Sequence, residues 1–292
     1  MLKHISLIIR HETEVPNRIG KVIKKLFHGY GVSVTEGKVN PQTDAIVVLG
    51  GDGTLLHVAG KAYQLGIPLL GINLGGLGFL TEIHINEMEQ ALDSLISGTF
   101  ELDKRTILSV TLKVAGSKDS TYYALNEAVI SKGPLSTIIT LPTWAGGSFL
   151  TTYRGDGLII SSATGSTAYN LSAGGPILHP CIEALILTPI CPFALNARPL
   201  ILPGRMKVAI QLRNAREKIS LVIDGQAGYE INEGDCVEVQ KAQGHLKLIK
   251  SPIRNYFTIL NGNARDRREV LLRDPEHLDP GIAAVGTCHH LA

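Results

Sequence analysis

The chain lacks the features that usually accompany secretion, metal binding or membrane insertion. Only 4 of its 292 residues are cysteines, and Cys181, Cys191, Cys236 and Cys288 form no CxxC pair. Buried or incidental thiols are therefore a better interpretation than a zinc site or a disulfide framework. No apolar run approaches the length of a membrane span, and Ile5 to Ile9 is too short for a signal peptide. We expect a cytoplasmic protein with no membrane partner.

Strong net charge is also missing. The formal net charge is +2, and only 18% of the residues are charged. This balance gives no indication of a nucleic-acid partner. Hydrophobic residues make up 44% of the chain, which is enough for a real core, and the length allows two domains. Any binding of an anion must come from a local arrangement of residues.

Three widespread motifs are absent from the sequence. It contains no G-x-G-x-x-G, no G-x-x-x-x-G-K-[ST] and no G-x-S-x-G. The nearest approach to the second motif runs from Gly31 to Lys38, but its spacing is one residue too long and Val39 follows. Rossmann-type hydride transfer, P-loop chemistry and α/β-hydrolase chemistry therefore lose their usual signals.

The most informative stretch that is present is Gly50-Gly51-Asp52-Gly53-Thr54. It lies between a buried-strand pattern at residues 44–49 and a helical pattern that begins at Thr54. Glycines let the backbone approach an anion, and a helix start offers N–H groups without partners. A carboxylate beside phosphates is repulsive unless it takes a proton or helps to hold a metal. A tight turn is the alternative, but it needs only one or two glycines, so we favour phosphoryl transfer centred on Asp52.

Strand and helix patterns divide the chain into two predicted domains. Residues 1–104 alternate strands and helices, which predicts an α/β domain with a parallel sheet, and a second glycine-rich turn follows its strand at residues 71–78. Residues 105–250 show period-two alternation separated by turn residues, which predicts a β-rich, sandwich-like domain. The segment 251–292 could pack back on the first domain. Within the β-rich domain, residues 154–176 are expected to form a long functional loop.

Three polar groups in the β-rich domain could carry binding chemistry. Asn126 and Glu127 can donate to and accept from a ribose or a base edge, although an exposed turn or strand end is the alternative. Asp156, between two glycines, is as easily a turn residue. The stretch from Thr164 to Asn170 offers hydroxyls, bare backbone and one aromatic ring, with a polar turn as its alternative.

Together these stretches resemble bacterial-type NAD kinases, the ATP-dependent enzymes that phosphorylate NAD to NADP. The matching segments follow the family's order and are Gly50–Thr54, Gly71–Gly75, Leu77–Thr81, Asn126–Glu127, Asp156–Ile160, Thr164–Leu178, Ala197–Leu200 and Asp224–Gln226. The part from Asp156 to Leu178 is the most specific. The Gly-Gly-Asp-Gly loop alone is not specific, because lipid kinases and phosphofructokinases have similar loops.

The resemblance implies a role for each matching residue. Asp52 is similar to the general base that takes the proton of the adenosine ribose 2′-hydroxyl, and Asp156 to a contact on the nicotinamide side. The implied phosphate contacts are Gly50, Gly51, Gly53 and Thr54. The implied NAD contacts are Asp52, Gly53, Phe79, Asn126, Glu127, Arg154, Asp156, Thr164, Ser166, Thr167, Ala168, Tyr169, Asn170, Leu171, Ser172 and Gln226.

The resemblance also implies partners and an assembly. NAD and ATP are the expected substrates, with Mg²⁺ bridging the ATP phosphates and no metal ligand assigned to the protein. The expected site lies between the two domains and is often completed across a subunit contact in a homodimer or homotetramer. Phe193 stands where the family usually has His, and residues 261–292 match nothing in the family. A lipid or sugar kinase and a non-catalytic dinucleotide-binding protein remain the alternatives, and the sequence does not distinguish ATP from polyphosphate as donor.

Overall fold

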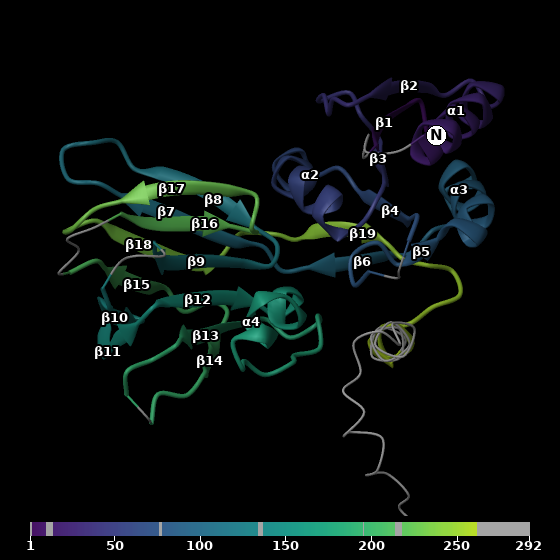
Figure 1. The fold of residues 1–292 in the computed structure, drawn as a ribbon. Coiled ribbons are helices and arrows are strands. Elements are labelled where there is room, and N and C mark those ends of the chain that lie inside the picture. Colours follow the sequence, from purple (N-terminus) through teal and green to yellow (C-terminus); the bar gives the residue numbers. More distant parts are fainter. Residues whose placement is uncertain are drawn as a thin grey trace, which may run out of the picture.

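The structure is a computed structural model that describes residues 2–9, 14–75, 78–133, 137–194, 196–213 and 218–261. An α/β part built on a mostly parallel sheet lies beside a β-rich part made of two antiparallel sheets (Figure 1). The predicted fold class is therefore confirmed. The predicted tail beyond residue 261 lies outside the described residues, as do Gly76 and Leu77 of the second glycine-rich turn.

The first sheet forms the centre of the α/β part. Its strands, in spatial order, are β2 (Ser33–Glu36), β1 (His4–Ile9), β3 (Ala45–Leu49), β4 (Leu69–Asn73), β19 (Leu246–Ile249) and β6 (Leu102–Arg105), with β5 (Ile83–His84) paired to β4. All pairs are parallel except β19 with β6. Strand β3 is buried along its whole length, as expected for a strand covered on both faces.

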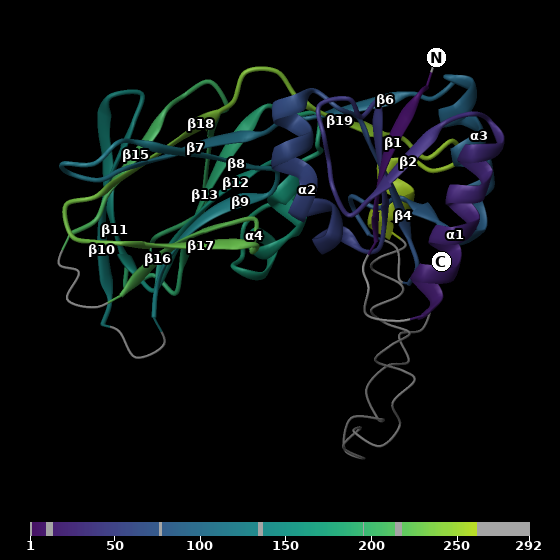
Figure 2. The same ribbon diagram turned by 90° about the horizontal axis from the view of Figure 1, so that it is seen from above.

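Helices cover both faces of this sheet. Helices α1 (Glu14–Gly29) and α3 (Met88–Ser97) pack on one face, and α2 (Asp52–Leu65) packs on the other, towards the β-rich part (Figure 2). Gly66 ends α2 with φ 68°, a left-handed conformation in which glycine carries no side-chain clash. His84 and Glu87 form a capping box around the 3₁₀ turn η1 (Ile85–Glu87), and α3 begins after it.

The β-rich part packs two six-stranded antiparallel sheets against each other. One contains, in spatial order, β11 (Ser148–Gly155), β10 (Ile139–Ala145), β15 (Val208–Gln211), β18 (Cys236–Lys241), β7 (Leu108–Lys113) and β8 (Ser120–Ala124). The other contains β14 (Leu200–Pro203), β13 (Ala184–Ile190), β12 (Gly157–Ser162), β9 (Glu127–Lys132), β16 (Ile219–Ile223) and β17 (Ala227–Ile231). A single apolar core from both sheets fills the space between them.

The long loop predicted at residues 154–176 is wrong in its first half. Strand β12 occupies residues 157–162, and all six residues are buried. Ser161 and Ser162 can be buried because their hydroxyls donate to backbone carbonyls, which satisfies groups that would otherwise be costly to bury. The second half contains a 3₁₀ turn, η2 (Thr164–Thr167), and the short helix α4 (Tyr169–Ser172).

The chain returns to the first sheet before it ends. Strand β19 lies within the range 105–250 assigned to the β-rich domain, yet it pairs with β4 and β6 of the α/β part. The segment after it, with a helical turn at 256–261, contacts the α/β part through an ion pair between Arg254 and Glu87. Within the described ranges, no helix combines the length and apolarity needed to cross a membrane.

Candidate active site

The glycine-rich stretch lies at the carboxyl end of β3, where ligands of parallel sheets usually bind. Helix α2 begins at Asp52, two residues earlier than expected, so Asp52 and Gly53 form its first turn. A methyl group built at Gly51 or Gly53 would meet no described atom within 4 Å beyond its chain neighbours. The fold itself therefore does not require glycine here, and the open space leaves room for a ligand against the helix start.

The Asp52 carboxylate accepts four hydrogen bonds from the segment after β4. Oδ2 accepts from the Phe79 N–H at 2.9 Å, and Oδ1 accepts from the N–H groups of Leu80 at 3.1 Å and Thr81 at 2.9 Å. The Thr81 hydroxyl donates a fourth bond to Oδ1 at 2.8 Å. Because a carboxylate has about four acceptor positions, Asp52 is nearly saturated by the protein.

A second layer of bonds fixes this segment. The Asn73 amide donates to Thr81 Oγ1 at 2.9 Å and accepts from the Gly75 N–H at 2.8 Å. Gly78 lies so close that a Cβ there would be 2.1 Å from Asp52 Oδ1, so no other residue fits without movement. The segment after β4 thus holds the Asp52 side chain in place.

In the β-rich part, the buried carboxylate of Asp224 orients a backbone segment, as residues 79–81 orient Asp52 in the α/β part. Asp224 accepts hydrogen bonds from three successive backbone N–H groups, those of Leu125 at 2.7 Å, Asn126 at 2.7 Å and Glu127 at 3.0 Å. Its own N–H donates to the Glu127 carbonyl at 3.0 Å, and its φ is 49°. A non-glycine residue in this left-handed region indicates strong local constraint. Asp224 therefore positions the backbone that presents Asn126 and Glu127.

Glu127 and Asp224 are two carboxyl groups buried close together. Burial raises the pKa of Glu127 to about 8, with the Asp224 charge adding to the effect. Burial also raises the pKa of Asp224 to about 6, against the opposing effect of its three backbone hydrogen bonds. Glu127 Oε2 is buried and finds no hydrogen-bond partner among the described residues. Of the alternative of an exposed turn or strand end, the strand end is confirmed because Glu127 begins β9 (Glu127–Lys132), but the exposure is wrong, since both Asn126 and Glu127 are buried.

The segments that hold the two carboxyl centres meet in one apolar cluster between the two parts of the molecule. Leu55 of α2 and Leu80, whose N–H bonds Asp52, share one apolar cluster with Leu125, the residue before Asn126. In Figure 1, α2 and α4 lie on the facing sides of the two parts. A cavity of about 250 Å³ between α2 and the β16–β17 turn is lined by Asp224 and by the exposed Gln226. Gln226 thus lies at the rim of this region.

The segment 164–172 divides into residues that face outward and residues that hold its shape. Thr164 is buried, and its hydroxyl has no partner within the described part of the chain. Tyr169 and Ser172 are exposed, while Thr167, Ala168 and Leu171 are half-buried. By contrast, Ser166 and Asn170 are buried and their polar groups are used internally. Ser166 bonds the Leu178 backbone, and Asn170 bonds the carbonyls of Ser166 and Pro176 and the hydroxyl of Thr188.

Arg154 and Asp156 lie at the opposite end of strand β12 from Thr164. They precede β12, whose other end leads into Thr164, and β12 pairs Gly157 with Ser131 but Ser161 with Glu127. Five residues of extended strand correspond to about 16 Å. Asp156 forms an ion pair with Lys132, and the Arg154 guanidinium stacks over the Phe193 ring. Within one chain, these two predicted contacts are therefore not brought to Asp52.

Comparison with known families decides the identity of the chain. Residues 10–100 match the ATP-NAD kinase N-terminal domain, and residues 125–251 match the ATP-NAD kinase C-terminal domain. The chain belongs to the NAD kinase family. It is therefore a kinase, and the predicted resemblance is confirmed.

Individual relatives agree with this membership. The NAD kinase of Geotalea daltonii is 45% identical over 219 residues, which cover 75% of this chain and 77% of the relative. The NAD kinase of Geobacter sulfurreducens is 46% identical over 217 residues, covering 74% and 76%. A crystal structure of yeast NADH kinase complexed with NADH superposes with a TM-score of 0.80 at 25% identity, covering 95% of this chain and 89% of that one.

Several residues that shape the site of this kinase are not predicted to do so by the sequence. Asp224, Asn73, Gly78 and Thr81 all lie in segments that match the family, but the sequence predicts no separate role for any of them. The signal for Asp224 lies almost 100 residues away, in the backbone of residues 125–127. No local pattern reports such a contact.

Proposed function

We propose that this kinase transfers the γ-phosphoryl group of ATP to the adenosine ribose 2′-hydroxyl of NAD, with Asp52 as general base. The observations that support the proposal are the open backbone beside Asp52 at Gly51 and Gly53, and the apolar cluster that joins Leu55 and Leu80 to Leu125, the residue before the buried pair Asn126–Glu127. In the transfer, the bond from the γ-phosphorus to the bridging oxygen breaks and a bond to the 2′-oxygen forms. ADP leaves with the electron pair, and Asp52 takes the hydroxyl proton.

The hydrogen bonds of Asp52 set a condition on this step. A carboxylate with four donors has almost no acceptor capacity left for a substrate hydroxyl. Oδ2 accepts only the Phe79 N–H, whereas Oδ1 accepts three bonds, so a hydroxyl that approaches Oδ1 must displace one donor. The Thr81 hydroxyl is the least constrained of these donors because it can rotate about its own bond, unlike the backbone N–H groups. Thr81 would therefore exchange its bond with the incoming 2′-hydroxyl.

The β-rich part supplies contacts to the dinucleotide. Glu127 Oε2 and Thr164 Oγ1 are buried polar atoms without partners in the described chain, and such groups favour a ligand that completes them. Asn126 and Gln226 offer amide groups nearby, and the exposed Tyr169 ring provides a surface for packing. Ser166 and Asn170 support this loop through internal bonds instead of contacting NAD directly.

We propose that Mg²⁺ arrives with ATP. Within the described ranges, no group of three or more His, Cys, Asp or Glu residues could hold a metal. This composition fits a cation held mainly by phosphates and water, as is usual for Mg²⁺ in kinases. Bound to ATP, it would neutralise charge on the phosphates. The N–H groups at Gly51, Gly53 and Thr54 would orient the same phosphates.

A coupled assay tests the activity. The protein is incubated with NAD, ATP and Mg²⁺, and NADP is measured with an NADP-specific dehydrogenase. Polyphosphate in place of ATP distinguishes the donors. A lipid or sugar kinase would phosphorylate its own acceptor and leave NAD unchanged, and a non-catalytic dinucleotide-binding protein would bind NAD without releasing ADP. Either result would overturn the proposal. The cytoplasmic location expected from the sequence stays a prediction.

We further propose a homo-oligomer in which Asp156 reaches the site of another subunit. This follows from the distance along β12 between Asp156 and the Asn126–Glu127 pair within one chain. Mixing separately inactive Asp52→Asn and Asp156→Ala chains should then restore activity, because mixed assemblies contain sites with both intact residues. In a dimer, about a quarter of the sites would be intact. If Asp156 acts within its own chain, no activity will return on mixing.

A further inference from the structure

The segment that bonds Asp52 takes little support from the first sheet. The N–H groups of residues 79–81 all donate to the Asp52 carboxylate, and these residues lie outside the strands. Strand β5, which follows, pairs with β4 through only two residue pairs. Glu82 stands between the two regions, directly after Thr81. The position of the Asp52 donors therefore depends in part on what holds the Glu82 side chain.

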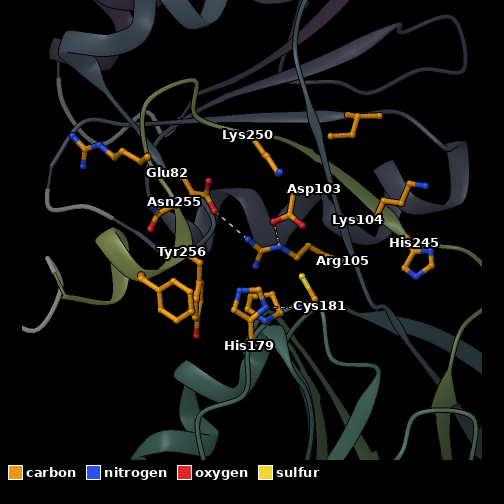
Figure 3. Close-up of a pocket in the computed structure, with 14 residues that line it drawn as sticks. Glu82, Asp103, Lys104, Arg105, His179, Cys181, His245, Lys250, Asn255 and Tyr256 are labelled. Atoms are coloured by element: carbon orange, nitrogen blue, oxygen red, sulfur yellow. Dashed lines mark hydrogen bonds and ion pairs between the residues drawn. The ribbon is translucent and has the colours of Figure 1, made fainter.

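Arg105, at the end of β6, bonds the Glu82 carboxylate. Its Nη2 donates to Glu82 Oε1 at 3.1 Å, and its Nε donates to Asp103 Oδ2 at 2.6 Å. Figure 3 shows the guanidinium between the two carboxylates. The Arg105 side chain is 2% exposed and that of Glu82 is 13% exposed, so solvent screens this pair weakly. The backbone N–H of Ser251 is a second donor to Glu82, which is thus held from two sides.

An arginine suits this position better than another cation. A guanidinium presents its N–H donors in one rigid plane, so bonds from Nε and Nη2 to two carboxylates fix a direction as well as a charge. Burial raises the pKa of Glu82, and the Arg105 charge limits this rise by favouring the carboxylate form. Arg105 therefore both orients the Glu82 side chain and keeps it able to accept hydrogen bonds.

The two donors to Glu82 lie beside the places where the chain crosses between the two parts of the molecule. Arg105 ends β6, and residues 106–107 lead to β7 of the β-rich part. Ser251 follows β19, which the chain reaches from β18 through residues 242–245. The Ala242 N–H donates to the Ile107 carbonyl at 2.8 Å, so the two crossings run side by side. Glu82 therefore links the segment that bonds Asp52 to the junction of the two parts.

From these contacts we propose that Arg105 is a positioning residue for the phosphoryl transfer, which holds Glu82, fixes residues 79–81 and so sets the direction of the Asp52 carboxylate. The effect on turnover rests on the proposed function, because it requires Asp52 as the base. Weakening the pair between Arg105 and Glu82 should lower kcat and leave the KM for NAD nearly constant, since most proposed NAD contacts lie in the β-rich part. An ion pair with a purely structural role would lower stability without this selective loss of kcat.

Two substitutions beside the same guanidinium separate positioning from stability. Glu82→Gln neutralises the partner that adjoins Thr81, and Asp103→Asn neutralises the partner that does not. Each weakens one ion pair of Arg105, so urea denaturation should show similar losses of stability. A small misplacement of a reacting group is costly, so kcat should fall by about tenfold or more in Glu82→Gln and stay within about twofold of the wild type in Asp103→Asn. Equal kcat values in the two folded variants would overturn the proposal.

Amide hydrogen exchange tests the positioning without an assay of turnover. The N–H groups of residues 79–81 donate to Asp52, so their exchange rates report those bonds. In peptides that span these residues, mass spectrometry should show severalfold faster exchange in Glu82→Gln and wild-type rates in Asp103→Asn. If the protein shows this difference and yet makes no NADP, the proposed function fails and the positioning by Arg105 survives. NADP formation with equal exchange in both variants gives the reverse result.

Arg105→Lys distinguishes direction from charge. Lysine keeps the positive charge but has one nitrogen in place of the planar fork, so it cannot bond both carboxylates in the same geometry. We expect kcat to fall as in Glu82→Gln, with circular dichroism confirming that the variant is folded. Lys104→Gln, on the exposed side of the same strand, is the control and should keep wild-type kcat. Wild-type kcat in Arg105→Lys would show that a positive charge alone is enough and would contradict positioning by the guanidinium.

Discussion

The α/β part and the β-rich part each bring a carboxyl side chain to the candidate active site, and they hold it in opposite ways. Asp52 is half-buried and accepts four hydrogen bonds from residues 79–81. Glu127 is buried beside another carboxyl group, and its Oε2 has no partner in the described chain. Asp52 is thus nearly saturated by protein donors, whereas Glu127 is held through its backbone and its Oε2 has no hydrogen-bond partner in the described chain.

This difference in hydrogen bonding suits the two carboxyl groups to different tasks. A saturated carboxylate has a fixed direction, which suits a group that must meet one hydroxyl in one geometry. A buried carboxyl with an unpaired oxygen is costly to the folded protein, and a ligand that bonds it recovers that cost. We therefore interpret Asp52 as the centre of the chemistry and Glu127 as a binding group. Changes to each should affect different measurements.

The largest expected effect is on turnover, from Asp52→Asn. The amide keeps the shape of the side chain but cannot accept a proton, so kcat should fall by about 10²–10⁴-fold. NAD binding, measured by calorimetry, should change far less. Near-normal turnover would contradict the assignment of Asp52 as base and would remove the proposed contrast with Glu127.

The next effect concerns stability and comes from Glu127→Gln. The pKa of Glu127 is raised to about 8, so the folded protein keeps a proton that the unfolded chain loses above a pH of about 4.3. Stability must then fall as the pH rises through this window, by at most about 1.4 kcal/mol per pH unit. Glutamine does not titrate. The variant should therefore lose this slope and gain stability over the wild type at pH 8.

Urea denaturation at pH 6, 7 and 8 checks this prediction. Because burial raises the pKa of Asp224 to about 6, this neighbour still titrates at pH 6, and the interval from pH 7 to pH 8 is the one that isolates Glu127. Histidines titrate in both proteins, and their contribution cancels in the difference. Glu230→Gln on the exposed edge of β17 is the control and should follow the wild type. Parallel curves for wild type and Glu127→Gln would show that Glu127 is ionised in the folded state.

The sequence predicted those parts of the site that depend on local pattern. The strand Ala45–Leu49 is a continuous apolar run, Gly66 ends the following helix, and Asp52 stands out among glycines. The motif match also singled out Asn126 and Glu127, whose role in binding stays a prediction. In each case the decisive information lies within a few residues of the feature, where periodicity and turn chemistry can report it.

The remaining parts depend on contacts between distant segments. Ser161 and Ser162 read as polar loop, yet they lie in a buried strand because carbonyls of residues 125 and 126 accept from their hydroxyls. In the sequence, Asp224 has the pattern of a turn residue. Its role is visible only in the folded chain, which brings three backbone N–H groups of residues 125–127 to its carboxylate. Polar residues satisfied by remote backbone are invisible to hydrophobic patterns, which explains why the first half of the segment 154–176 was predicted as a loop although it contains strand β12.

A paired glycine experiment sharpens the comparison within the Asp52 loop. Gly78→Ala places a methyl group 2.1 Å from Asp52 Oδ1 and should cost about 1–3 kcal/mol of stability, together with much of the activity. Gly53→Ala meets no described atom within 4 Å and lies in the first turn of α2, so stability should stay constant or rise by up to about 1 kcal/mol. Activity should nevertheless fall if phosphates approach that backbone. Full activity in Gly53→Ala would argue against the phosphate contact.

The smallest expected effect comes from Thr81→Val, which removes one of the four donors to Asp52. Loss of this buried hydrogen bond should lower the free energy of unfolding by about 1 kcal/mol. Because the proposed reaction requires that donor to give way, kcat should stay within about tenfold of the wild type. Thr81→Ser keeps the hydroxyl and should preserve kcat, although the lost methyl group also costs some stability. If Thr81→Val reduced kcat as strongly as Asp52→Asn, the hydroxyl would belong to the reacting groups, and saturation of Asp52 would be part of the chemistry instead of a bond that the substrate displaces.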